Sequence, residues 1–294
     1  AATEGARLLA PRYEAHTPRI GLDGDAPFEI ESPGFGRPGT TVHGDVEAGH
    51  AAAVRSVDLT YETPGQYHNA MEPHAVVAAW DGDRVTLDIP SQAIVMSCAA
   101  YGYYLGIPAE NVTIRSPYLG GGFGSKAVIH GPQVLAIHVA RLLGRPVKLA
   151  LRRDQLFGPV GHRGATRQRL RIGIDGEARL TVLDHESLAV TSSFDDFIES
   201  AANASQGIYA AGAIRSAHQG VRADVGTPGP MRAPGLATGS AALECAMDEM
   251  AEAAGLDPLE FRLRNYAETE PGTGKPYSSK ALRECYAEGA ERFG

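Results

Sequence analysis

Gly120-Gly121-Gly122-Phe123-Gly124-Ser125-Lys126 is the stretch around which the rest of the chain can be arranged. It lies between a predicted strand at 111–116 and a predicted helix at about 129–143. Glycines at four of five successive positions leave the backbone bare, so that peptide N–H groups can approach a ligand and adopt positive φ where needed. A glycine-rich turn without a ligand explains the loop alone equally well.

The loop does not match the phosphate-binding motifs. A Walker loop needs Gly-Lys-Ser/Thr at its end, whereas here Ser125 precedes Lys126 and Ala127 follows it. A dinucleotide fingerprint expects an acidic residue about 20 positions further on, where residues 140–143 offer none. Both nucleotide interpretations are therefore minor alternatives.

Composition narrows the function classes. The 294 residues are 43% apolar, which suffices for the core of one large domain or two smaller ones. A net charge of −8 without a basic run argues against a nucleic-acid partner, and the longest apolar runs, such as 134–139, are too short for a membrane span. Cys98, Cys245 and Cys285 lack C-x-x-C spacing, which disfavours a metal cluster built by this chain alone and favours a reducing compartment. Without an initiator Met or an apolar signal segment, we expect a processed or excised piece.

The pattern along the chain mixes β-hairpins with helices. It therefore predicts an α+β fold and not a doubly wound parallel sheet. Residues 1–53, rich in Gly, Pro and acidic residues, are expected to form an extended connector, and two sub-lobes are expected at 54–160 and 161–294. The predicted elements are a strand from 54, a hairpin at 75–80 and 85–89, a helix capped by Ser91 and ending near Gly106, a strand at 147–151, a hairpin at 168–174 and 178–189, and helices at 195–206, 238–254, 257 onward and 279–293.

Two single residues could carry chemistry besides the loop. Gln92, just inside a predicted helix start, has a neutral amide that can donate to an oxo ligand, although a solvent-facing helix residue is the simpler interpretation. Arg232 lies in Met231-Arg232-Ala233-Pro234-Gly235, where proline and glycine fix the backbone. Its amide and guanidinium could meet an anionic group, and the alternative is an ordinary surface arginine.

Two other polar clusters are weaker candidates. Residues 68–74 offer two imidazoles and a carboxylate, but Pro73 prevents the regular helix that would place them on one face for zinc. Asp195-Asp196 is a poor acid/base pair because helix neighbours point apart, and we interpret it as favourable charge at a helix N-terminus.

Taken together, these segments resemble the molybdenum-binding large subunit of the xanthine oxidase family of molybdenum hydroxylases. The matching stretches are 66–74, 88–92, 120–126, 144–155 and, most specifically, 231–235 running into 239–265. The likeness is closest to the three-subunit bacterial aldehyde oxidoreductases. It implies that 1–53 is the tail of a preceding hammerhead domain with its linker, and that 54–294 is the N-terminal half of the molybdopterin-binding domain.

The resemblance also implies site residues. In the family a pterin dithiolene holds the molybdenum, so no side-chain ligand is expected. Gln92 would face an oxo group, the 121–124 backbone would pack against the cofactor with Phe123 beside the substrate channel, and Arg232 would border the metal centre. Such preorganised donors stabilise charge that builds up as hydride leaves the substrate. The general-base glutamate of the family is not found, so we expect the catalytic residue to lie outside this chain.

Two departures bear on the substrate. Ala127 stands where purine-oxidising members carry a glutamate, and Ser200 stands near their substrate-binding arginine. The resemblance therefore implies oxidation of an aldehyde to a carboxylic acid, and hydroxylation of a purine or pyridine is the alternative.

The implied cofactor is molybdenum-molybdopterin, usually the cytosine dinucleotide form in bacteria, with [2Fe–2S] clusters and FAD on partner subunits. The remaining half of the molybdenum domain is a further expected partner, and the compartment is cytoplasmic, or periplasmic by co-export with a partner. A non-catalytic cofactor-docking module and a purely structural globular protein are hypotheses of other classes.

Overall fold

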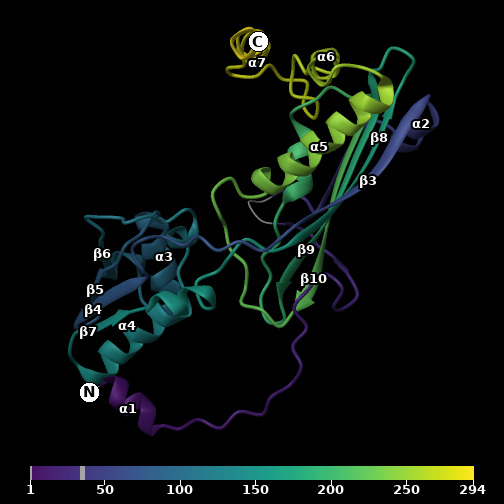
Figure 1. The fold of residues 1–294 in the computed structure, drawn as a ribbon. Helices are drawn as coiled ribbons and strands as arrows, with labels where there is room; N and C mark the ends of the chain where they lie inside the picture. The colour runs from purple at the N-terminus through teal and green to yellow at the C-terminus, as the bar shows by residue number, and fades with distance from the viewer. Residues whose placement is uncertain (1, 34–36) are drawn as a thin grey trace.

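The computed structural model describes residues 2–33 and 37–294, which form two lobes lying side by side (Figure 1). The larger lobe is built on a long twisted sheet and the smaller one on a four-stranded sheet. The smaller lobe is inserted between two neighbouring strands of the larger one, so that the chain crosses from lobe to lobe twice. At the crossing the two segments pair, since the amides of Gln66 and Arg163 each donate to the other residue's carbonyl at 3.0 and 2.8 Å.

The large sheet has the strand order β1-β10-β9-β8-β3, with β2 also paired to β10. Its β8/β9 hairpin confirms the second predicted hairpin, and β9 runs parallel to β10. The strands are β1 (Phe28–Glu29), β2 (Thr40–His43), β3 (Arg55–Thr63), β8 (Thr166–Ile174), β9 (Leu180–Ser192) and β10 (Ala213–Ala223).

The small sheet has the order β6-β5-β4-β7 and packs against two helices. Both helices end as predicted, because Gly106 and Gly144 adopt the left-handed C-cap conformation that favours glycine. The elements are β4 (Ala75–Asp81), β5 (Arg84–Asp88), α3 (Ile94–Leu105), the 3₁₀ turns η1 (Ala109–Asn111), η2 (Ser125–Ala127) and η3 (Arg153–Phe157), β6 (Val112–Arg115), α4 (Gly131–Leu143) and β7 (Val147–Ala150).

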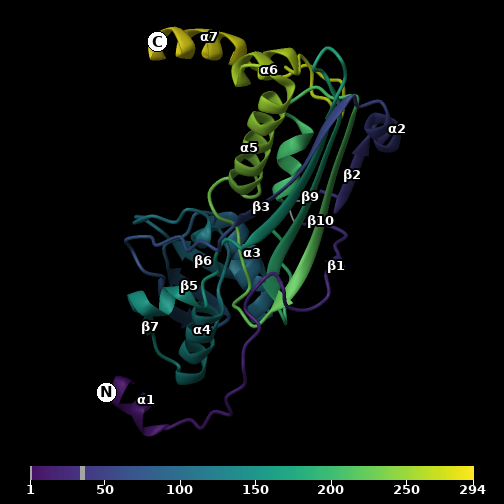
Figure 2. The ribbon, with the colours of Figure 1, turned by 45° about the vertical axis from the view of Figure 1, so that its right-hand side comes forward.

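The remaining helices lie on the large lobe or at the chain ends (Figure 2). They are α1 (Ala2–Leu8), α2 (Val46–Ala51), α5 (Leu236–Ala254), α6 (Pro258–Arg264) and α7 (Leu282–Phe293). Asp257 caps α6 by accepting from the amides of Leu259 and Glu260, which agrees with the helix predicted from 257 onward. Among the described residues, no helix combines the length and apolarity that crossing a bilayer requires.

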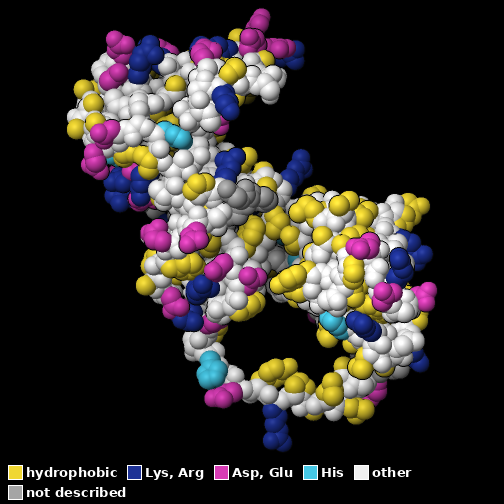
Figure 3. Space-filling view, turned by 180° about the vertical axis from the view of Figure 1, so that it is seen from behind, with side chains coloured by type: hydrophobic (Ala, Val, Ile, Leu, Met, Phe, Trp, Pro, Cys, Tyr) yellow, Lys and Arg dark blue, Asp and Glu magenta, His cyan; other side chains and the backbone are white. Residues whose placement is uncertain are grey.

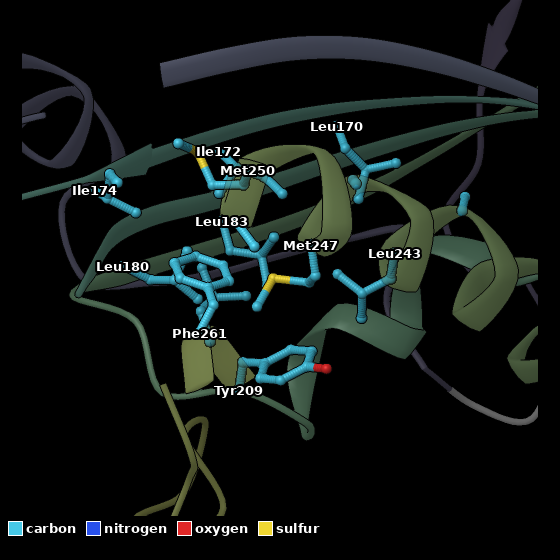
Figure 4. Packing of buried hydrophobic residues seen from close by; sticks show 14 of the residues in the cluster. Leu170, Ile172, Ile174, Leu180, Leu183, Tyr209, Leu243, Met247, Met250 and Phe261 are labelled. Atoms are coloured by element: carbon cyan, nitrogen blue, oxygen red, sulfur yellow. The ribbon is translucent and has the colours of Figure 1, made fainter. Parts of the chain in front are cut away.

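The main core lies between α5 and one face of the large sheet (Figure 4). Leu243, Met247 and Met250 recur at helical spacing on α5 and pack against Leu170 and other inward-facing sheet residues. This face of α5 fixes the position of its first turn, which directly follows the loop at 231–235.

Apolar side chains remain exposed on the smaller lobe (Figure 3). Val95, Met96 and Tyr103 of α3 are 84%, 72% and 82% exposed. The buried residues of α3, Ser97, Tyr101, Gly102 and Leu105, lie along one face, and the exposed apolar side chains belong to its other faces.

The α+β prediction is confirmed, but several element assignments are wrong. The helix predicted at 195–206 is only the 3₁₀ turn η4 (Ala201–Gln206), because Thr191 and Ser192 hydroxyls bond the backbone of Asp195 and hold it in a turn. Asp195-Asp196 therefore stands at no helix N-terminus, and Asp196 instead pairs with Arg222 at 2.9 Å.

Three further differences concern segments with weak local signals. The pattern does not predict strand β10, and α1, α2, β1 and β2 all lie inside the range predicted as an extended connector. Ser91 does not cap α3, because the helix begins later with Ala93 as its N-cap. The Ser91 hydroxyl instead accepts from the Ala93 amide at 3.1 Å.

Candidate functional site

The glycine-rich loop leads from β6 to α4. A lysine and a glutamate, bonded to each other, hold it in place. The Lys126 ammonium, whose side chain is fully buried, donates to the Glu72 carboxylate at 2.7 Å and to its backbone carbonyl at 2.9 Å. The same carboxylate accepts from the Gly120 amide at 2.9 Å. Burial is the largest single influence and opposes ionisation of Glu72, but the hydrogen bonds from Lys126 and the Gly120 amide, together with the charge of Lys126, outweigh it and lower the pKa of this carboxyl. Lys126 therefore holds the loop and is not available to bind a phosphate.

A histidine and a serine support the middle of the loop. The Ser125 hydroxyl donates to the Val160 carbonyl at 2.9 Å, so it accepts from His74 Nε2, also at 2.9 Å. His130 Nε2 donates to the Ser125 carbonyl at 2.7 Å. Burial lowers the pKa of His74 to about 4, which keeps this imidazole neutral near pH 7.

Gln92 is locked onto the loop through its amide oxygen. Gln92 Oε1 accepts from the amides of Gly124 at 3.0 Å and Lys126 at 3.2 Å. Because two donors face this oxygen, the carboxamide orientation is fixed and its NH₂ group points away from them. Within the described part of the chain, that NH₂ group makes no hydrogen bond. A Cβ on Gly122 would lie 2.2 Å from the same oxygen, so the glycine there makes room for Gln92.

The second loop, 231–235, joins the first one directly. The Arg232 amide donates to the Phe123 carbonyl at 2.8 Å. A Cβ on Gly124 would lie 2.2 Å from the Pro230 carbonyl oxygen, and His68 Nε2 donates to that oxygen at 2.9 Å. The Arg232 side chain is exposed and makes no hydrogen bond or ion pair with the residues that the structure describes.

An open hollow of about 630 Å³ lies at this junction. It is lined by Gln66, Tyr67, His68, Phe123, Arg163, Met231 and Arg232. Phe123 and Arg232 thus share one hollow, whereas Gln92 is bonded to the loop without lining it.

The donor set at the junction suits an anionic, acceptor-rich group. Among residues 2–33 and 37–294, the amides of Gly121, Gly122 and Phe123 have no hydrogen-bond acceptor. Three successive N–H groups and the Gln92 NH₂ group are neutral donors, which can meet oxo, sulfur or phosphate atoms without a counter-charge. Positive φ at Gly121 and Phe123, +93° and +53°, gives the loop the sharp course that leaves these amides unpaired.

The residues considered for zinc serve other purposes. In the described residues no group of three or more His, Cys, Asp or Glu side chains is arranged to hold a metal ion. His68 bonds the Pro230 carbonyl, whereas Glu72 and His74 bond two neighbouring residues of the glycine-rich loop, Lys126 and Ser125.

A second hollow, of about 360 Å³, lies on the large sheet and is lined by three arginines and two glutamates, among other residues. Its arginines are paired, Arg167 with Glu62, Arg169 with Asp58 and Arg215 with Glu186. Among the described residues that line it, each arginine is thus paired with a carboxylate and is not free to bind an anionic ligand.

Comparison with known proteins decides the family. The profile of the molybdopterin cofactor-binding domain matches residues 33–266. The chain belongs to the molybdopterin cofactor-binding domain family. It is 42% identical over 255 residues to the aldehyde oxidoreductase molybdenum-binding subunit PaoC of Escherichia coli K12, covering 85% of this chain and 34% of that protein.

Two more distant similarities agree. The xanthine dehydrogenase molybdenum-binding subunit of E. coli O157:H7 is 28% identical over 305 residues, covering 99% of this chain and 40% of that protein. The fold is that of quinoline 2-oxidoreductase from Pseudomonas putida 86, with a TM-score of 0.81, 24% identity, and coverage of 98% of this chain and 40% of that one. The chain thus spans about a third of the length of PaoC.

The sequence predicts the substrate from two positions, Ala127 and Ser200. Ala127 is in the turn η2 directly after the glycine-rich loop. Ser200 is buried, and its carbonyl oxygen would lie 2.5 Å from a Cβ on Gly235. Neither position supplies a charged group near the junction.

Two residues of the site carry no signal in the sequence. Arg163 and Glu199, both buried, form an ion pair with 3.0 Å between Nε and Oε1. Burial raises the pKa of Glu199, opposed by hydrogen bonds from the Gly235 amide and Arg163. They lie 36 residues apart in irregular segments, so neither spacing nor periodicity connects them. The only local hint is the pair of glycines that flank Arg163 at positions 161 and 164.

Proposed function

We propose that this chain forms part of the molybdenum site of an enzyme that oxidises aldehydes to carboxylic acids with oxygen from water. The observation that carries the proposal is the cluster of unpartnered neutral donors at the loop junction, in a chain of this family. The bound molybdenum-molybdopterin would supply the two-electron chemistry, and the protein would supply placement and electrostatics.

Named residues have distinct proposed roles. The N–H groups of Gly121, Gly122 and Phe123, with the Gly124 backbone behind them, would hold the cofactor, and the NH₂ group of Gln92 would donate to an oxo ligand. Arg232 would bring its unpaired guanidinium to the border of the metal centre. Because Gln92 Oε1 is fixed by two loop amides, its donor is preorganised, and the complex pays little to orient it on binding.

An aldehyde is a better candidate substrate for this site than a purine. No charged group stands at Ala127 or Ser200 to anchor a polar heterocycle, and a small neutral aldehyde needs none. The 42% identity to an aldehyde oxidoreductase subunit, against 28% to a xanthine dehydrogenase subunit, supports the same choice.

Further polypeptide would complete the enzyme. Since the chain spans about a third of its relative PaoC, we place the general-base glutamate and the rest of the cofactor pocket in a second half of the molybdenum domain. Residues 1–53 would be the end of a preceding domain, and 54–294 the N-terminal half of this one. Subunits with [2Fe–2S] clusters and FAD would accept the electrons, and the pterin would be the cytosine dinucleotide form. Cytoplasm, or periplasm by export with a partner, is the compartment proposed.

The experiment uses the complete natural protein that contains this chain, purified with its partners. Mass spectrometry for molybdenum and fluorescence of the oxidised pterin should give one of each per chain, and benzaldehyde should be oxidised in preference to nicotinate and xanthine. Gln92→Ala should lower turnover at least tenfold, whereas the control Gln219→Ala, on strand β10, should not. A protein without molybdenum or pterin would overturn the site, and faster turnover of xanthine or nicotinate would overturn the substrate class.

A further inference from the structure

A buried ion pair lies beneath the 231–235 loop. Arg163 and Glu199 are 4% and 1% exposed, and the Glu199 Oε1 atom that accepts from Arg163 also accepts from the Gly235 amide at 2.8 Å. Arg163 NH1 donates to the side chain of Gln66 at 3.1 Å. Ordering a guanidinium in the interior requires that several of its five donors be used, and here they are.

The Arg163 guanidinium also donates hydrogen bonds to three carbonyl groups of the 231–235 loop. Arg163 NH2 donates to the carbonyl oxygens of Met231 at 3.2 Å, Arg232 at 2.6 Å and Ala233 at 3.4 Å. Three successive carbonyls face one buried group only because the loop turns sharply there. Ala233 accordingly has φ +57°, a left-handed conformation that non-glycine residues rarely adopt.

Peptide geometry then determines where the amides point. All described peptide bonds are trans, so each N–H is directed opposite to the carbonyl of the preceding residue. With the Met231 carbonyl on Arg163, the Arg232 N–H points away and meets Phe123. With the Arg232 carbonyl on Arg163, the Ala233 N–H also points away from the ion pair. Ala233 is an exposed residue, and in the part of the chain that the structure describes its amide has no acceptor.

We propose that the Arg163–Glu199 pair is a positioning device that presents the Ala233 N–H as a hydrogen-bond donor to an oxo or sulfur acceptor of the molybdopterin cofactor. The inference rests on the proposed function and adds to it one binding group and two positioning residues. A lysine at position 163 would keep the charge but not the fork of donors, so it cannot hold Glu199 and the loop carbonyls at once.

The decisive test replaces one backbone N–H group by an oxygen atom. Replacing Ala233 by lactic acid through nonsense suppression, in the complete cofactor-loaded protein, turns the 232–233 amide into an ester that lacks the N–H. We expect cofactor release during dialysis, followed by molybdenum and pterin content, to accelerate about 3- to 10-fold. The matched control is lactic acid at Ala10, which is also exposed, has φ +38° and lies far along the chain in the N-terminal segment.

The positioning role has its own readout. Arg163→Lys should accelerate cofactor release to a similar extent and change the electron paramagnetic resonance spectrum of the molybdenum centre, while Glu199→Gln, which keeps an acceptor for Gly235, should have a smaller effect. If Arg163→Lys fails to fold, the ester variant alone decides. Release at the wild-type rate in the folded ester variant would overturn the inference and leave the proposed function intact, whereas a wild-type protein without cofactor would refute the proposed function itself.

Discussion

Gly122→Ala should destabilise the smaller lobe through a single clash with Gln92. The added Cβ would lie 2.2 Å from Gln92 Oε1, 2.5 Å from Cδ and 2.9 Å from Cγ, so the carboxamide must retreat by more than an ångström. Its two hydrogen bonds from Gly124 and Lys126 would then be lost. At about 1 kcal/mol net for each bond, the free energy of unfolding should fall by about 2 kcal/mol. Gly122 is not at positive φ, so backbone strain adds nothing.

A double-mutant cycle isolates the clash. Gln92→Ala deletes all three atoms that the new methyl group would meet, so in that background Gly122→Ala should cost under about 0.5 kcal/mol. The control is Gly131→Ala at the first position of α4, where a Cβ meets nothing within 4 Å. Urea unfolding followed by Trp80, the single tryptophan, reports on this lobe because its indole N–H bonds the Ile137 carbonyl. An equal cost of Gly122→Ala in both backgrounds would refute the reasoning.

Three further predictions address stability. Lys126→Met should lower the free energy of unfolding by about 2–4 kcal/mol in the same urea assay, since the Glu72 carboxylate loses its buried partner; a change under 1 kcal/mol would contradict this. Burial holds the pKa of His74 at about 4 instead of 6.5, so the unfolded chain binds the proton first as pH falls. Stability should therefore drop between about pH 6.5 and 4, by up to about 3 kcal/mol from this group, and His74→Gln should flatten that slope in pH-dependent unfolding; an unchanged slope would speak against it. Phe261→Ala should cost about 3–5 kcal/mol by calorimetry and the 97% exposed Phe293→Ala under about 0.5, and similar costs for both would be inconsistent with the packing.

The sequence predicts those helices and strands whose ends are marked by neighbouring residues, such as turn residues and helix-ending glycines. The hairpin of β4 and β5 turns at a short polar loop, and α3 and α4 end at glycines, so neighbouring residues sufficed to place them. Strand β10 was missed because its burial comes from pairing in parallel with β9 on one side and with β1 and β2 on the other, and pairing between distant segments leaves no local period.

The site residues also differ in whether a local signal in the sequence predicts them. The glycine-rich loop and Arg232 stand out in the sequence because glycine and proline mark their backbone. Why the glycines are needed could not be foreseen, since Gly120, Gly122 and Gly124 make room for Glu72, Gln92 and Pro230, which come from other segments. Arg163 and Glu199 were missed for a related reason, because a buried ion pair is visible only after the chain has folded.

The location of molybdenum tests the account most directly. Anomalous diffraction at the molybdenum edge, from crystals of the complete protein, should give one strong peak at the junction of the glycine-rich loop with the 231–235 loop, within reach of the Gly121–Phe123 amides and the Gln92 NH₂ group. A peak elsewhere on this chain, or none in a protein that oxidises aldehydes, would contradict it.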